Sequence, residues 1–186
     1  WLIAYTKIPA FIATLGTQLI ARALALLYTN AYPIPELKPG LKAVAQYNLF
    51  GFIPMVIVIF IIFAVISGFM LTQTRFGKCI YAIGGNDQAA RVAGINVEKN
   101  LIKVYTWCAF CASVGGILLA ARSGAGNASV GVNYELDAIA AATVGGTSHS
   151  GGVCRISGVI AGILILGILK NGMMLLKISP YVQQVC

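Results

Sequence analysis

Charged side chains are scarce in this chain of 186 residues, which has 13 Lys and Arg, 5 Asp and Glu, and a single His. Charged residues make up 10% of the chain, whereas about a quarter of an ordinary soluble domain is charged. The hydrophobic fraction is 59% and the mean hydropathy is +0.86. The composition excludes an ordinary soluble domain and predicts an integral membrane protein.

Motifs for several kinds of chemistry are also missing. The basic residues give a net charge of +8 but form no basic run interleaved with aromatics, so nucleic-acid binding is not expected. Cys108 and Cys111 match C-x-x-C, yet they lie in an apolar run without a second pair to complete a metal site. No phosphate loop occurs, because Gly77-Lys78 is followed by Cys79 and lacks the upstream glycine. We assign no catalytic or metal-binding residue and expect no ATP hydrolysis by this chain.

Long apolar runs are the main feature of the sequence. A run of about 20 residues is needed to cross the hydrocarbon core as a helix, and we expect spans at 9–28, 52–72, 101–121 and 156–176. The apolar run 136–144 is too short to span, so we expect it to be an interrupted or re-entrant helix. The predicted fold is an all-α integral membrane protein, a fragment of a polytopic helix bundle.

Basic residues in the connections predict the orientation. Arg75, Lys78, Arg91 and Lys99 cluster around the connection 73–100, which we therefore place in the cytoplasm. Alternation of the spans then puts 29–50 and 123–133 outside. The prolines of 29–50 rule out a regular helix through Pro39.

The most polar stretch, "GGNDQAARVAGI" from Gly84 to Ile95, predicts a helix of about two turns. Asn86 suits the N-cap, Asp87 the first turn and Gly94 the C′ position. A helix this short is not stable alone in water, so it must dock on another surface.

The side chains of this short helix suggest what it offers. Ala89, Val92 and Ala93 share one face at i, i+3, i+4 spacing. Two interpretations stay open from the residues alone. The helix is either a connector packed on its own bundle or a peg that fits a groove of a separate cytoplasmic protein and transmits that protein's movement.

The stretch "GGTSHSGG" at 145–152 combines four glycines with three hydroxyl side chains. Non-helical backbone in a transporter can line a site for a polar solute, but such glycines can also permit close helix packing, and both readings stay open. His149 has no second His or paired carboxylate beside it, which disfavours a metal or proton role. Glu135 and Asp137 suit the N-terminus of a short helix better than an acid/base pair.

Three segments together resemble a known family. "TRFGKCIYAIGGNDQAARVAGINVEKN", "YELDAIAAATVGGTSHSGG" and "IPAFIATLGT" are similar to the permease subunit of bacterial ABC sugar importers of the ribose, galactoside and inositol type. This type shares a superfamily with branched-chain amino acid permeases. The resemblance implies one transmembrane permease domain over residues 1–186, a fragment lacking N-terminal spans and the last C-terminal span, with a coupling loop at 74–100.

The resemblance also implies which residues act in transport. The candidate residues that couple to the ATPase are Gly84, Gly85, Asn86, Ala89, Ala90, Arg91, Gly94 and Ile95. The candidate substrate path is formed by Thr14, Thr17, Gly145, Gly146, Thr147, Ser148, Gly151 and Gly152.

The implied function is import of a monosaccharide or related polyol across the bacterial inner membrane by a multi-pass permease that is not itself an enzyme. The implied partners are a cytoplasmic ABC ATPase, a periplasmic or lipid-anchored sugar-binding protein and a second permease subunit, with a homodimer expected. ATP and Mg²⁺ would be held by the ATPase, and no cofactor is expected in this chain. The alternatives are a permease for another small polar solute, such as a branched-chain amino acid or a nucleoside, and, from other classes, a channel or an intramembrane enzyme. The sequence does not identify the sugar.

Overall fold

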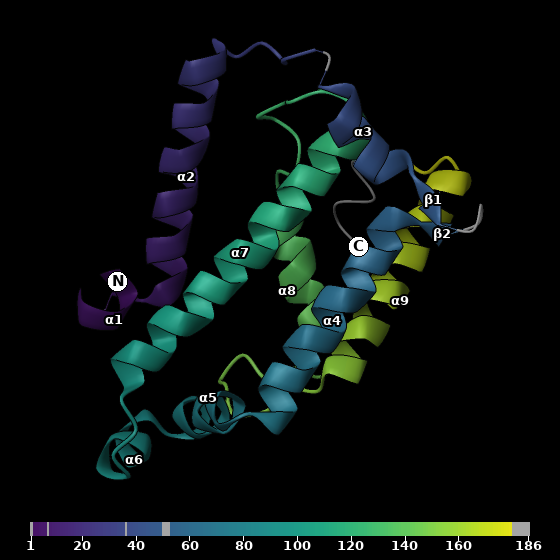
Figure 1. Ribbon diagram of the computed structural model, residues 1–186. Coiled ribbons are helices and arrows are strands. Elements are labelled where there is room, and N and C mark those ends of the chain that lie inside the picture. Colours follow the sequence, from purple (N-terminus) through teal and green to yellow (C-terminus); the bar gives the residue numbers. More distant parts are fainter. Residues whose placement is uncertain (1, 7, 36, 50–52, 180–186) are drawn as a thin grey trace. The chain divides into compact units, whose positions relative to one another are not determined.

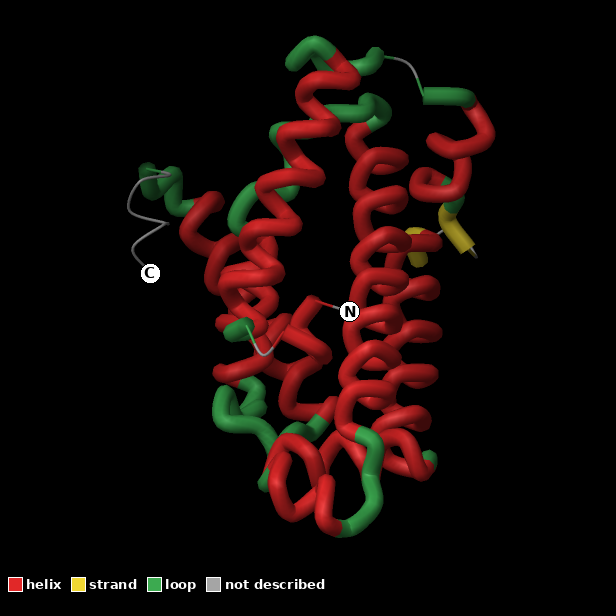
Figure 2. The backbone as a smooth tube through the Cα atoms, turned by 90° about the vertical axis from the view of Figure 1, so that its left-hand side faces the viewer, coloured by secondary structure: helices red, strands yellow, loops and turns green. Residues whose placement is uncertain are grey.

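The computed structural model of the chain describes residues 2–6, 8–35, 37–49 and 53–179 (Figure 1). Almost all regular structure in these ranges is helical, and the strands are limited to one short pair (Figure 2). The helices are α1 (Leu2–Thr6), α2 (Ala10–Thr29), α3 (Pro39–Gln46), α4 (Met55–Gln73), α5 (Arg75–Gly85), α6 (Asp87–Val92), α7 (Val97–Ser123), α8 (Tyr134–Val144) and α9 (Ile156–Leu175). The predicted all-α class is confirmed.

Four of the described helices, α2, α4, α7 and α9, are long and apolar enough to cross a membrane. They correspond to the four expected spans. Their apolar side chains are largely exposed, including Leu19 at 65%, Val65 at 65% and Ile168 at 72%. Exposure of this kind fits a bilayer, where lipid tails or other spans cover apolar side chains, because lipid exerts no hydrophobic force that would bury them within the chain.

The structure differs from the expected elements in the connections. α3 begins at Pro39. Proline suits the first helical position, because an N–H at that position would have no acceptor within the helix. The pair β1 (Asn48–Leu49) and β2 (Ile53–Pro54) is antiparallel, with Leu49 opposite Ile53. Neither element was predicted, because the three prolines of 29–50 indicated only turns. The predicted span 52–72 starts too early, because Ile53 and Pro54 form β2 and α4 begins at Met55. Phe52 lies outside the described residues.

The chain divides into two compact units, each described here by itself. Unit 1 comprises the residues up to Cys79 together with Ala90–Val132, and unit 2 comprises Ile80–Ala89 together with the residues from Asn133 onward. The single permease domain expected over the whole chain stays a prediction.

In unit 1, α3 packs against α7 and α4. An aromatic cluster joins α4 to α7, with Phe63 5.9 Å from Phe110 and 6.3 Å from Trp107 between ring centroids. The Trp107 Nε1–H also donates to Ser67 Oγ at 3.2 Å. Since an indole N–H inside a bilayer needs an acceptor, this bond helps to fix the packing of the two helices.

In unit 2, α8 and α9 form an antiparallel hairpin with closely packed backbones. A Cβ built on Gly162 of α9 would overlap the carbonyl oxygen of Ala141 in α8, and one built on Gly145 would lie 2.5 Å from the oxygen of Gly158. Gly158 and Gly162 are four residues apart and so lie on one face of α9, the spacing at which small residues let helices approach. α8 is short, as predicted.

Candidate coupling segment and glycine-rich bend

A tight corner joins α4 to α5 in unit 1. Thr74 ends α4 with an extended backbone, and its hydroxyl donates to Met70 O at 2.5 Å and accepts from Gly77 N at 3.2 Å. Gly77 is buried, and any Cβ there would overlap the backbone of Leu71. The corner therefore requires glycine at this position. In the sequence, Gly77 was considered only as part of a possible phosphate loop, and this structural role was not predicted.

α6 has the ends that its sequence predicted. Asn86 Oδ1 accepts a hydrogen bond from Ala89 N at 3.0 Å, which makes Asn86 the N-cap. At the other end Gly94 has φ +80°, Ile95 N donates to Ala90 O and Gly94 N donates to Arg91 O, each at 3.0 Å. These two bonds form the Schellman motif, in which a left-handed glycine satisfies the last carbonyls of a helix.

The two faces of α6 differ sharply in exposure. Val92 is 90% exposed, and Ala89 and Ala93 beside it are exposed as well. Ala90, by contrast, is only 4% exposed. An isolated apolar side chain as open as Val92, held on a short helix with both ends capped, is available for contact with a partner. Ala90, one of the predicted coupling residues, is buried and can act only through packing.

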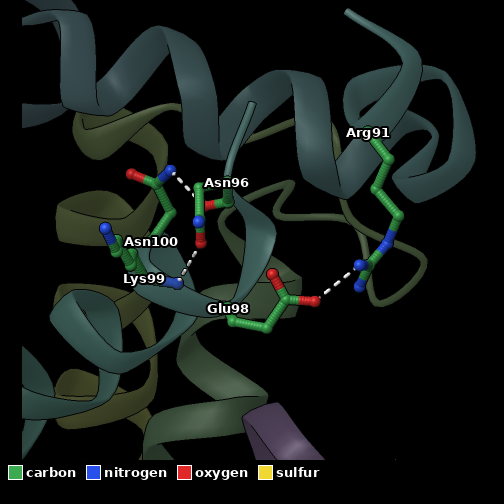
Figure 3. Close-up of polar contacts among 5 residues, drawn as sticks. All are labelled: Arg91, Asn96, Glu98, Lys99 and Asn100. Carbon is green, nitrogen blue, oxygen red and sulfur yellow. Dashed lines mark hydrogen bonds and ion pairs between the residues drawn. The ribbon is translucent and has the colours of Figure 1, made fainter. Parts of the chain in front are cut away.

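The turn after α6 is fixed to the first residues of α7 by polar contacts in unit 1 (Figure 3). Arg91 Nη1 lies 2.5 Å from Glu98 Oε1. Asn96 caps α7, its Oδ1 accepting from Lys99 N at 2.9 Å, and its carbonyl accepts from Asn100 Nδ2 at 2.8 Å. This cap starts α7 four residues before the predicted start of the span. The end of α6 is thereby held to the start of a membrane-spanning helix.

In unit 2 the end of α5 meets the glycine-rich bend. A Cβ built on Gly84 would lie 2.5 Å from Gly152 N, and one on Gly151 would lie 2.6 Å from Gly84 O. Gly151 and Gly152 have φ of +87° and +77°, a backbone region that other residues rarely adopt. Two stretches that the sequence singled out separately are thus in direct backbone contact.

A side-chain hydrogen bond ties the same two segments. The Tyr81 hydroxyl donates to Cys154 O at 2.8 Å, although the residues are 73 positions apart. Burial, and to a lesser extent the neighbouring Cys154, raise the pKa of Tyr81 above its ordinary value of 10.0. The phenol therefore stays protonated and able to donate at neutral pH. Sequence reasoning missed Tyr81, because nothing in its local pattern indicates a distant backbone partner.

The bend itself is an ordered turn. α8 ends in a second Schellman motif, with Gly146 at φ +83°, Gly146 N donating to Thr143 O and Thr147 N donating to Ala142 O. Ser148 N then donates to Val153 O at 3.1 Å, while Ser148 Oγ accepts from Ser150 N at 3.2 Å. His149 is exposed. The predicted roles of Gly145, Gly146, Thr147, Ser148, Gly151 and Gly152 in a substrate path stay predictions.

The other candidate path residues, Thr14 and Thr17, lie on α2 in unit 1 and are exposed. Each hydroxyl donates to carbonyls of its own helix, Thr14 to Ala10 O at 2.9 Å and Thr17 to Thr14 O at 2.9 Å. Their hydroxyl oxygens still have lone pairs that can accept hydrogen bonds from a solute. Their part in the path also stays a prediction.

Unit 2 contains an ion pair that the sequence did not predict. Asp137 in the first turn of α8 lies 2.5 Å, between Oδ2 and Nζ, from Lys170 of α9. Glu135 and Asp137 occupy the first turn of α8, where the helix dipole favours carboxylates, as expected. The pair in addition links the two helices of the hairpin at the end opposite the bend.

A groove of about 580 Å³ lies in unit 1 between α4 and α7. Its lining is mostly apolar, with Met70, Phe76, Ile102, Trp107 and Phe110 forming most of its wall. A sugar needs several hydrogen-bonding groups around it, so this groove does not suit one.

These observations define a class: a multi-pass α-helical membrane protein with a short, doubly capped helix exposed between two spans. The family model described as "Branched-chain amino acid transport system / permease component" matches residues 1–185. The chain therefore belongs to this family of transport permeases, as the sequence motifs indicated. It is a multi-pass protein of the bacterial inner membrane.

Similar proteins are named as sugar import permeases. The chain is 42% identical over 190 residues to the ribose import permease protein RbsC of Escherichia coli (strain K12), an alignment that covers 99% of this chain and 58% of that protein. It is 39% identical over 194 residues to the galactose/methyl galactoside import permease protein MglC of Salmonella typhimurium (strain LT2), with 99% and 56% covered. It is 39% identical over 189 residues to RbsC of Bacillus subtilis (strain 168), with 99% and 58% covered.

The chain thus spans just over half the length of these relatives. No solved structure matches it with statistical significance.

Proposed function

We propose that this chain forms part of the membrane path of an ATP-driven importer for a monosaccharide or related polyol. The observation that carries the proposal is α6, a helix of six residues capped at both ends, whose side chain Val92 is 90% exposed. A helix this short has no independent stability, so the caps and the Arg91–Glu98 ion pair hold it in place for contact with another protein. The names of the relatives, which refer to ribose and galactose import, support a sugar as the transported solute.

The partner at α6 is a separate cytoplasmic ABC ATPase, which binds ATP and Mg²⁺. Movement of the ATPase changes the position of α6 and so favours one packing of the spans over the other. Only a difference in free energy between the inward-open and outward-open states can drive this switch, and the ATPase supplies it by binding α6 more tightly in one state than in the other. A sugar-binding protein outside and a second permease subunit, in a homodimer, complete the importer, and the permease itself catalyses no reaction.

A branched-chain amino acid is the second candidate solute, favoured by the description of the matching family model. The two solutes differ in charge, since an amino acid brings a carboxylate and an ammonium group into the path. In unit 2, the stretch 138–154, which contains the glycine-rich bend, has no carboxylate and no Lys or Arg, and Asp137 just before it is paired with Lys170. This scarcity favours the uncharged sugar.

The test is uptake by the complete permease reconstituted in liposomes with its ATPase and binding protein. Labelled ribose, galactose, inositol, leucine and valine are supplied with and without ATP inside. We expect ATP-dependent accumulation of at least one of the first three solutes and none of the amino acids. Accumulation of leucine or valine alone would select the second candidate, and uptake independent of ATP would contradict an ABC importer.

A further inference from the structure

The contact between α5 and the glycine-rich bend is made by backbone atoms and by one side-chain hydroxyl. Gly84 packs on Gly151 and Gly152 through backbone atoms, and Tyr81, three residues earlier on α5, donates to the carbonyl of Cys154 just after the bend. Residues three apart lie on the same face of a helix. One face of α5 therefore holds the bend at two points.

We propose that Tyr81 and Gly84 act as positioning residues that transmit movement of α6 to the hairpin of α8 and α9. We call the contact of Tyr81 and Gly84 with Gly151, Gly152 and Cys154 the clasp. This inference rests on the proposed function, because it supplies a route by which an ATPase bound at α6, whose first residues Asp87–Ala89 belong to unit 2, acts on the rest of that unit.

The clasp is stiff because backbone meets backbone. No side chain separates Gly84 from Gly152, and a single added methyl group would come within 2.5 Å of the Gly152 nitrogen. Contacts between backbone atoms leave no side-chain rotamer that could change to absorb a displacement, and the Gly84, Gly151 and Gly152 backbones already lie as close as packed atoms allow. A shift of the end of α5 must therefore shift the bend.

The link from α6 to the clasp is short. α5 ends at Gly85 and α6 begins at Asp87, so only Asn86 lies between them. Asn86 is held on both sides, since its N–H donates to Ala82 O at 3.0 Å and its side chain caps α6. α6 and α5 are thus joined without a flexible linker.

On the far side of the clasp, α8 and α9 move together. Gly145 packs on Gly158, Gly162 packs on Ala141, and the Asp137–Lys170 ion pair joins the opposite end of the hairpin. A displacement of the bend is consequently shared by both helices. The hydrogen bond from Tyr81 also restrains the orientation of the bend, because a hydrogen bond is directional whereas the backbone contact at Gly84 is not.

The experiment measures how much ATP is hydrolysed for each sugar imported. The complete permease is reconstituted with its ATPase and binding protein, and labelled ribose or galactose uptake and phosphate release are followed in the same liposomes. Tyr81→Phe removes only the hydroxyl. Gly84→Ala inserts a methyl group into the clasp. Gly167→Ala is the matched control, since it adds a methyl group to α9 where nothing lies within 4 Å.

We expect Tyr81→Phe to raise the ATP-to-sugar ratio about two- to tenfold, the effect expected from loss of one hydrogen bond. Gly84→Ala should raise it further, and Gly167→Ala should leave it unchanged. Gly85→Ala should raise the ratio less than Gly84→Ala, because a Cβ on Gly85 meets nothing within 4 Å. Co-purification with the ATPase should be retained in Tyr81→Phe, which separates transmission from docking.

The outcomes are distinguishable. A parent transporter that works, with Tyr81→Phe and Gly84→Ala both at the parental ratio, overturns the clasp and leaves the proposed function standing. If Gly84→Ala prevents assembly of the transporter, the ATP-to-sugar ratio of Tyr81→Phe alone tests the clasp. A parent complex that imports no sugar with ATP overturns the proposed function and the clasp with it.

Discussion

Arg91 Nη1 lies 2.5 Å from Glu98 Oε1, so the last turn of α6 is ion-paired with the first turn of α7 across the loop at Gly94. The pair joins the exposed helix to a membrane span. Its side chains are 47% and 28% exposed, so water and salt weaken it, and exposed pairs contribute about 0 to 1 kcal/mol. Its role is to orient α6 rather than to stabilise the fold.

Glu98→Gln should therefore lower ATPase stimulation modestly, by less than about fivefold, because that free energy corresponds to a factor of this size. The loss should shrink at high salt, which already screens the parental pair. Stimulated ATP hydrolysis at low and high salt checks both effects. The double variant Arg91→Glu with Glu98→Arg should recover part of the loss, and a loss that is equal at both salt concentrations would argue against an ion-pair origin.

Gly94→Pro should lower uptake and stimulated ATP hydrolysis together. Proline cannot adopt φ +80° and lacks the N–H that donates to Arg91 O, so the end of α6 loses its Schellman motif. Gly94→Asn is the control, since asparagine tolerates the left-handed region better than other residues. Binding of sugar to the external protein should be unchanged in both. Equal activity of the two variants would show that the geometry of this turn is irrelevant to coupling.

Gly162→Ala should destabilise the α8–α9 hairpin. The new methyl group would overlap the Ala141 carbonyl, and overpacking of this kind costs about 1 to 3 kcal/mol. Gly167→Ala, on the same helix but in open space, should not destabilise it. Thermal unfolding of the detergent-solubilised permease compares the two. A midpoint that falls equally for both would mean that α8 and α9 do not pack as closely as the structure shows.

Asp137→Asn should lower the thermal unfolding midpoint, because it leaves Lys170 without its ion-pair partner near the end of a membrane span. The double variant Asp137→Asn with Lys170→Met removes both charges and should recover most of the loss. A double variant that is less stable than the single one would contradict the pairing.

The sequence was sufficient for the features that depend on local patterns. Uncharged runs such as 52–72 predicted the spans, and the ends of α6 followed from Asn86 and Gly94, because caps are formed within a few residues. α5 was not predicted, because polar and apolar residues are mixed along it and no helical period of apolar residues was apparent in this polar connection. The i, i+4 glycines Gly158 and Gly162 could have indicated the close approach of α8 and α9.

The contacts that join distant segments could not be read from the sequence. Gly84 carries no side chain that would indicate a partner, and the acceptor of the Tyr81 bond is a backbone carbonyl, which every residue has. In the sequence, Lys170 is a single lysine near the end of the span 156–176, and nothing beside it indicates an ion-pair partner. Only the fold brings Asp137 to it. Long-range pairings of this kind depend on how the helices pack.

Site-specific cross-linking at α6 tests the central claim most directly. Val92→Cys places a thiol on a side chain that is 90% exposed, whereas Ala90→Cys places one at a position that is 4% exposed on the same helix. In the complete transporter we expect Val92→Cys to form a cross-link with the ATPase subunit and Ala90→Cys to form none. If Val92→Cys captures no ATPase in a complex that hydrolyses ATP and imports sugar, α6 is not the site of coupling and the account is wrong.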